Sequence, residues 1–156
     1  MHLRTGTIDV WPFRRIDGRV EYLLLHTSQE KADRWFNGGR FWQIPGDFMA
    51  EDESVVSCVE RSLAENSLVA ASIWAVEHTY TIYNRRFNEL QLLMVMAAEV
   101  TSDSMASLTW EHSEFRWCSA EECTRLLRFR GLIEGLHWTR QYITEIVAPL
   151  PELRLK

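Results

Sequence analysis

The chain has 156 residues, of which 46% are hydrophobic and 25% are charged, and this balance allows it to bury the core of one ordinary domain. The same composition excludes a disordered chain, a collagen-like repeat and a coiled coil. The formal net charge of -5 disfavours nucleic-acid binding by a basic face. No apolar run approaches the ~20 residues that a membrane-spanning helix needs. We therefore expect one domain, spanning residues 1–156, that binds neither nucleic acid nor membrane.

The cysteines give a prediction about the redox compartment. Cys58, Cys118 and Cys123 are odd in number and do not have the spacing of a metal site. The segment Met1–Arg4 begins no signal-peptide hydrophobic stretch. Reduced thiols and a cytoplasmic location are the simplest expectation.

The first third of the chain predicts short strands. Alternating β-forming residues predict strands over residues 5–13 and 20–26, joined at Asp17-Gly18, a dipeptide typical of a hairpin turn. Residues 27–40 are polar and contain two adjacent glycines, which predicts a loop. A short aromatic strand over residues 41–44 should end at Pro45-Gly46.

The remainder predicts a central helix, more strands and two final helices. Apolar residues recur at helical spacing within Glu53–Asn66. The sequence Ser119-Ala120-Glu121-Glu122 is typical of a capping box at a helix start. The predicted strands cover residues 69–83, 87–100 and 115–117, and the predicted final helices cover residues 119–129 and 132–147. This order predicts an α/β fold, with a mixed sheet between helices in an α/β/α sandwich.

The segment from Trp42 through Asp47 to the central helix resembles the Nudix box. The pattern of that family is G-x5-E-x7-R-E-U-x-E-E-x-G-U, where U is a bulky aliphatic residue. With Asp47 in the first position, Glu53, Arg61 and Glu65 fall on the first glutamate, the arginine and the second-last glutamate. The Trp-x-x-Pro-Gly approach to the helix is also similar to the family.

The match to the box is degenerate. Ser62 and Asn66 stand where the family places metal-binding glutamates, and Leu68 replaces the closing glycine. A register that starts one residue earlier, at Gly46, would put Glu60 on the arginine position, so we prefer the first register. Both registers keep Glu65 on a metal-ligand position.

A second segment strengthens the resemblance. Glu111-His112, followed by Trp117 and a short helix, is similar to the EH-x-x-x-x-W segment of many Nudix proteins, including the dihydroneopterin triphosphate and dATP pyrophosphohydrolase-like subgroup. In that subgroup the acid approaches the metal from a loop across the site, and Glu111 inherits this role by position. The resemblance extends over most of the chain, from about Thr5 to Phe129.

The resemblance implies a set of site residues. Mg²⁺ or Mn²⁺ would be weakly held by Glu65, Glu53, Glu111 and Asn66, and catalysis would depend on Glu65, Glu111 and Arg61. The candidates for substrate binding are aromatic and basic residues near the box, which can stack on a base or hold phosphates: Trp35, Phe36, Arg40, Trp42 and Arg85. For Trp42 core packing is the stronger alternative, and Glu53 and Glu65 can also be read as solvated helix acids.

Two functions from different classes follow. The first is a divergent Nudix hydrolase that cleaves a nucleoside diphosphate linked to another moiety, with Mg²⁺-assisted attack of water on phosphorus. The second is a catalytically weak or inactive Nudix fold that binds a ligand or a protein partner, because two box carboxylates are lost. We expect a small-molecule nucleotide partner, and the family's frequent dimers make a homodimer an alternative to a monomer.

Overall fold

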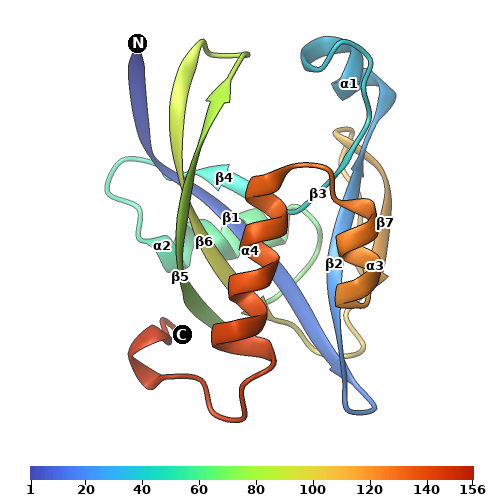
Figure 1. Cartoon of the computed structure of the whole chain (residues 1–156), viewed down its shortest axis with the longest axis vertical. Helices are drawn as coiled ribbons and strands as arrows, with labels where there is room; N and C mark the ends of the chain where they lie inside the picture. Colours follow the sequence, from blue (N-terminus) through green and yellow to red (C-terminus); the bar gives the residue numbers. More distant parts are fainter.

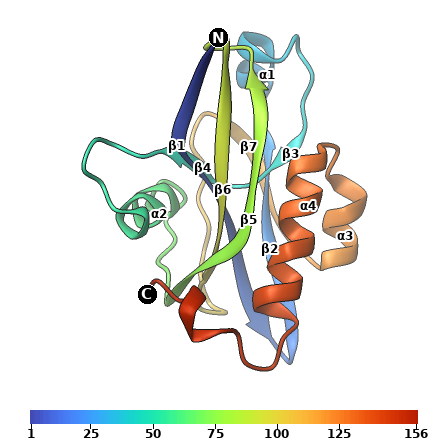
Figure 2. The same cartoon turned by 60° about the vertical axis from the view of Figure 1, so that its left-hand side comes forward.

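The computed structural model describes all 156 residues. The chain forms a mixed sheet between two layers of helices. In Figure 1 and Figure 2, α2 lies on one side of the sheet and α3 and α4 lie on the other. The strands are β1 (His2–Ile16), β2 (Arg19–Thr27), β3 (Trp42–Gln43), β4 (Gly46–Phe48), β5 (Ser72–Asn84), β6 (Glu89–Glu99) and β7 (His112–Cys118). The helices are α1 (Gln29–Trp35), α2 (Val55–Ala64), α3 (Ala120–Leu126) and α4 (Arg130–Thr139), with a π-helical turn at Arg140–Thr144 and a 3₁₀ turn at Pro151–Leu153. This arrangement confirms the predicted sandwich.

The sheet is mixed because β1 pairs in parallel with β6, whereas all its other pairings are antiparallel. The strand order is β3-β2-β1-β6-β5, with β4 added on β1 and β7 added on β2. The hairpin strands β1 and β2 pair only from Phe13 to Ile16 and from Arg19 to Tyr22, next to the turn. Beyond these positions β1 continues beside β4 and β6, while β2 continues beside β3 and β7. The two halves of the sheet therefore separate.

Each face of the sheet buries its own core. One cluster, which includes Trp11, Tyr22 and Leu136, fills the space under α3 and α4. The other, which includes Val59 and Leu63, lies between the sheet and α2. The side chains of a strand alternate between the two faces, so β1 sends Trp11 to the first cluster and Val10 to the second.

Several local predictions are confirmed. Asp17 and Gly18 both have positive φ, at 51° and 75°, as the hairpin turn requires. Both hydrogen bonds of the capping box between Ser119 and Glu122 start α3. The central helix is two residues shorter at each end than predicted. It begins later because Ser54 accepts a hydrogen bond from the Ser57 amide and caps it, and the chain leaves the helix after Ala64 in a turn where Ser67 has a φ of 59°.

Two sequence-based element predictions were wrong, and one strand was not predicted. Residues 27–40 are not wholly a loop, since Ser28 caps the seven-residue helix α1 through the Lys31 amide. The strand β3 ends before Pro45-Gly46 as predicted, but β4, which begins at Gly46 against β1, was missed; a Cβ on Gly46 would lie 2.7 Å from the Ile8 carbonyl oxygen. The last helix begins earlier than predicted and becomes π-helical after Thr139. None of the helices is both long enough and apolar enough to cross a membrane.

Candidate functional site

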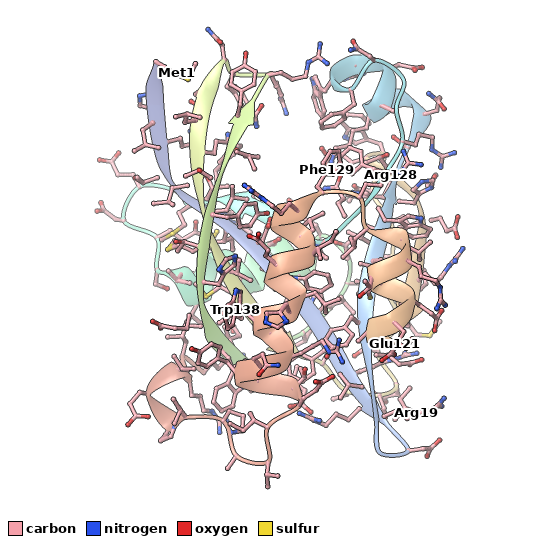
Figure 3. All side chains as sticks on the ribbon, viewed as in Figure 1. Met1, Arg19, Glu121, Arg128, Phe129 and Trp138 are labelled. Carbon is pink, nitrogen blue, oxygen red and sulfur yellow. The ribbon has the colours of Figure 1, made fainter.

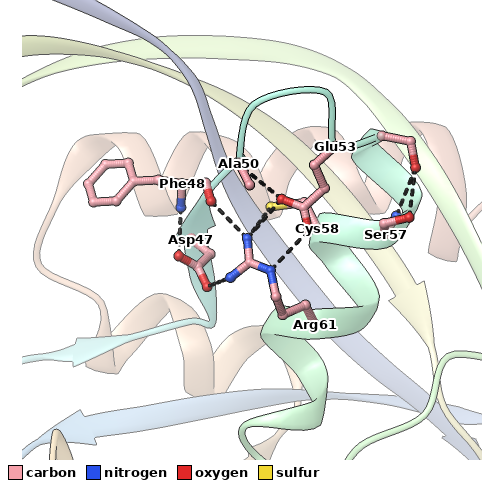
Figure 4. A network of polar contacts seen from close by, with 8 residues as sticks. Asp47, Phe48, Ala50, Glu53, Ser57, Cys58 and Arg61 are labelled. Carbon is pink, nitrogen blue, oxygen red and sulfur yellow. Dashed lines mark hydrogen bonds and ion pairs between the residues drawn. The ribbon is translucent and has the colours of Figure 1, made fainter.

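Arg61 on α2 organises the loop between β4 and that helix. Its guanidinium donates two hydrogen bonds of 2.9 Å to the two carboxylate oxygens of Glu53, and one of 2.6 Å to Asp47 Oδ2 (Figure 4). It also donates to the Phe48 carbonyl at 2.8 Å. These bonds fix the loop to the helix and stabilise the charged form of Glu53, whose pKa falls to about 2. The residues that the resemblance aligns with the first glutamate and the arginine of the box therefore contact each other.

The structure does not bring Glu53 to the other candidate metal ligands. Both of its oxygens accept hydrogen bonds from Arg61, and Oε2 also accepts from the Ala50 amide at 2.8 Å. Its geometry is that of a residue that positions the loop. Glu65, Asn66 and Glu111, in contrast, line one polar pocket of about 50 Å³.

This polar pocket forms where the two halves of the sheet separate. The residues that line it include Leu25 of β2, Gln43 of β3, Gly46 of β4 and Ser62 of α2. Glu65 and Asn66 reach it from the C-terminal end of α2, and Glu111 reaches it from the loop before β7. Segments that lie far apart in sequence thus place two carboxylates on one cavity.

A lysine that sequence reasoning missed shares the pocket. Lys31 lies on the inner face of α1, is only 8% exposed, and places its Nζ 3.7 Å from Glu111 Oε1. A backbone hydrogen bond of 2.8 Å from the Ser28 amide to the Glu111 carbonyl ties the start of α1 to the loop. The serine cap before Lys31 was the signal in the sequence that could have identified this helix.

The charges in the pocket influence one another. Burial raises the pKa of Glu65, and the negative charges of Asp47 and Glu111 raise it further, against Arg61 and Lys31. Burial lowers the pKa of Lys31, although the negative charge of Glu111 opposes this effect. The pocket is therefore a place where acids and an ammonium group are held together at the expense of their hydration.

Two polar atoms on the pocket wall have no hydrogen-bond partner within the chain. One is Nε2 of His112, a residue that is 9% exposed, and the other is Oε1 of Gln43. Burial lowers the pKa of His112 to about 3, so the ring is neutral at neutral pH. Buried polar atoms are normally hydrogen-bonded, so these two indicate that the cavity receives a polar ligand or water.

A second pocket, of about 190 Å³, is aromatic and basic. Phe41 contacts Phe36 and Phe129 edge to face, with ring centroids 4.9 Å apart in both pairs. Figure 3 shows Phe129 beside Arg128 at the end of α4 that faces α1. The arginines of this aromatic–basic pocket are Arg40, Arg85 and Arg128, and no acidic residue lines it. Its chemistry suits a planar ring that carries negative charge.

The five predicted substrate-binding residues are divided between three places. Phe36, Arg40 and Arg85 line the aromatic–basic pocket together. Trp35 lies outside it, edge to face with Trp110 and with the Arg86 guanidinium 3.9 Å from its ring centroid. Trp42 is 9% exposed and belongs to the core under α3 and α4, where it stacks on His26.

The residues present do not assemble a complete divalent-metal site. No group of three or more His, Cys, Asp and Glu side chains that could hold a metal ion occurs in the structure. Glu53 is engaged by Arg61, and Lys31 approaches Glu111. Asn66 donates its amide N–H to the Ser107 carbonyl at 2.9 Å and offers only a neutral oxygen to a metal. Two carboxylates face this cavity, and the Lys31 ammonium occupies the side of one of them where a cation would bind.

The comparisons with known proteins agree with the resemblance found in the sequence. The family model of the NUDIX domain matches residues 4–139. A NUDIX hydrolase structure from Listeria monocytogenes is 20% identical with a TM-score of 0.73, covering 89% of this chain and 94% of that one. An Ap4A hydrolase from C. elegans is 15% identical with a TM-score of 0.72, covering 90% and 98%. The NUDIX domain of Shewanella oneidensis NrtR, complexed with ADP ribose, is 23% identical with a TM-score of 0.67, covering 86% and 85%. A comparison with curated protein sequences gives no match.

Proposed function

The chain belongs to the Nudix family, and from this membership we propose that it binds a nucleoside diphosphate linked to another moiety. The aromatic–basic pocket is the observation that carries the proposal. It presents three phenylalanines and three arginines without an acid, and it contains Phe36, Arg40 and Arg85, which the sequence predicts as substrate-binding residues. A base stacked on an aromatic ring gains about 1–3 kcal/mol, and arginine forks match phosphate oxygens.

The two pockets are close enough in the chain to serve one elongated ligand. Phe41 lines the aromatic–basic pocket and Gln43, two residues further on, lines the polar pocket. Arg40 lines the first pocket and also hydrogen-bonds Ser113, the neighbour of His112 in the second. We place the base in the aromatic–basic pocket and the group beyond the diphosphate toward the polar pocket.

Two structural neighbours handle ligands of this chemical class. The Shewanella NUDIX domain was crystallised with ADP ribose, and the C. elegans protein is an Ap4A hydrolase. Both ligands contain a nucleoside joined to phosphates that bear a second group. They are therefore the first probes to use with this chain.

The test measures the equilibrium binding of ADP ribose and Ap4A by calorimetry, with adenosine as the uncharged control. Arg128→Met should weaken binding by about tenfold or more, because a charge-assisted hydrogen bond contributes about 1.5–3 kcal/mol. Arg130→Met is the matched control, since its side chain is 88% exposed and pairs only with Glu134. Failure of every phosphate-bearing probe to bind, or equal losses in the two variants, would refute the proposal.

Hydrolysis of the same ligands is the second candidate. The observation that favours it is the convergence of Glu65 and Glu111 on one cavity, where a carboxylate can accept a proton from a water that attacks phosphorus. Nudix proteins generally use a divalent metal such as Mg²⁺. Product analysis with each probe, in Mg²⁺, in Mn²⁺ and in a chelator, separates binding from turnover. Turnover that is unchanged by Glu65→Gln would remove this mechanism.

A further inference from the structure

We propose that Lys31 supplies the positive charge between Glu65 and Glu111 that a bound divalent cation would otherwise supply, so that the polar pocket works without a metal. The inference concerns the polar pocket alone and does not depend on the identity of the ligand. It explains why an acid-poor box coexists with a buried lysine. It also makes Lys31 the residue that decides whether a divalent cation can enter.

The position of Lys31 is fixed by the fold. The Ser28 side chain accepts a hydrogen bond of 3.0 Å from the Lys31 amide, so the lysine lies in the first turn of α1. Lys31 and Ala32 are the buried residues of this helix, so the helix face that carries them is its inner face. The 2.8 Å backbone bond from Ser28 to Glu111 holds the carboxylate and the ammonium on adjoining segments. The contact therefore does not depend on two freely moving surface chains.

The pocket wall carries two acids and one ammonium group. Ser62 and Asn66 contribute no charge from the box helix, which leaves Glu65 and Glu111 as the acids on the cavity wall. A buried lysine is tolerated when acids neutralise it, and Glu111 approaches it to 3.7 Å. A divalent cation placed between the same two carboxylates would be repelled by Lys31 at short range, and it would remove the partner of a buried ammonium.

The two lysines of the chain provide a direct test, because Lys31 and Lys156 are the only ones. Protein labelled with ¹³C at lysine Cε should give two NMR signals, which Lys156→Met would assign. Mn²⁺ broadens signals of nearby nuclei, and Lys156, which pairs with Glu60 at 2.6 Å, does not line the pocket. We expect the Lys31 signal to survive Mn²⁺ additions at least as well as the Lys156 signal. Selective loss of the Lys31 signal would overturn the proposal.

The reciprocal test removes the lysine charge. Lys31→Met should bind Mn²⁺ at least about tenfold more tightly than the wild type, measured as a Mn²⁺-dependent rise in melting temperature, because the repulsion is gone. The gain should disappear in the Lys31→Met/Glu65→Gln double variant, and Lys156→Met should behave like the wild type. Absence of a gain in a folded Lys31→Met protein would overturn the proposal. Should that variant fail to fold, the NMR experiment on the wild type decides the question.

Discussion

A buried carboxylate on β1 makes a quantitative prediction about the pH dependence of stability. Asp9 is 9% exposed, and its Oδ2 accepts a hydrogen bond from the Tyr80 hydroxyl. Burial raises the pKa of Asp9 from 3.8 to about 6, even though the hydrogen bond from Tyr80 opposes this rise. The native state therefore binds the Asp9 proton more tightly than the unfolded chain does.

The magnitude follows from linkage between proton binding and folding. A shift of about two units corresponds to about 3 kcal/mol. Because the folded pKa is raised, the contribution of Asp9 to stability is fully present below pH ~4 and is lost as the pH rises through about 6. Asp9→Asn keeps the side-chain shape and an acceptor for Tyr80 but cannot ionise. The variant should be more stable than the wild type at pH 7, by up to about 3 kcal/mol, and this advantage should vanish near pH 4.

The assay is urea unfolding of the wild type and Asp9→Asn at half-unit steps between pH 4 and pH 8. Asp103→Asn is the matched control, because Asp103 is exposed, and its free energy of unfolding should follow the wild type at every pH. The difference between the wild type and Asp9→Asn isolates one carboxylate from all other titrating groups. Parallel pH profiles for these two proteins would refute the reasoning.

Three further predictions concern the loop network, one glycine and the thiols. Arg61→Met should lower the free energy of unfolding by about 1–2 kcal/mol, because Arg61, although 43% exposed, bridges Asp47 and Glu53. Arg34→Met, which removes one exposed ion pair within a helix, should cost under about 0.5 kcal/mol, and urea unfolding of both variants checks this difference. Gly131→Ala should lower the melting temperature through a loss of about 1–3 kcal/mol, since its Cβ would lie 2.2 Å from a Tyr80 ring carbon, and an unchanged melting temperature would contradict this. All three cysteines are buried, so a thiol reagent should modify them slowly in the native protein and completely in urea; rapid native labelling of any one would contradict the packing.

The features that could be predicted from sequence are those that depend on residues close together in the chain. The hairpin at Asp17-Gly18 needs two residues that tolerate positive φ, and the capping box at Ser119 needs two side chains three residues apart. The box register aligns Glu53 and Arg61 with two positions of the family pattern eight residues apart; the resemblance implied that Glu53 binds a metal, whereas the structure pairs it with Arg61. Each of these signals lies within a single turn or helix.

Helix α1 could not be predicted in the same way, because its stability depends on distant contacts. Seven residues are too few to form a stable helix alone, and the two glycines that follow it are typical of a loop. Its buried residues gain their partners from the segment around Glu111, roughly half the chain away. The pocket itself was equally hidden, since it depends on the point at which β1 and β2 stop pairing.

The division of the acids explains why the box sequence alone was ambiguous about function. Glu53 and Glu65 lie at opposite ends of α2 and have the same chemistry, yet Arg61 binds both oxygens of the first and leaves the second facing the cavity. The cation that shares the cavity with Glu65 is Lys31, which no pattern within the box encodes. Under the proposal made for Lys31, cleavage by this Nudix chain depends less on the number of acids that remain than on which cation, Mg²⁺ or Lys31, lies among them.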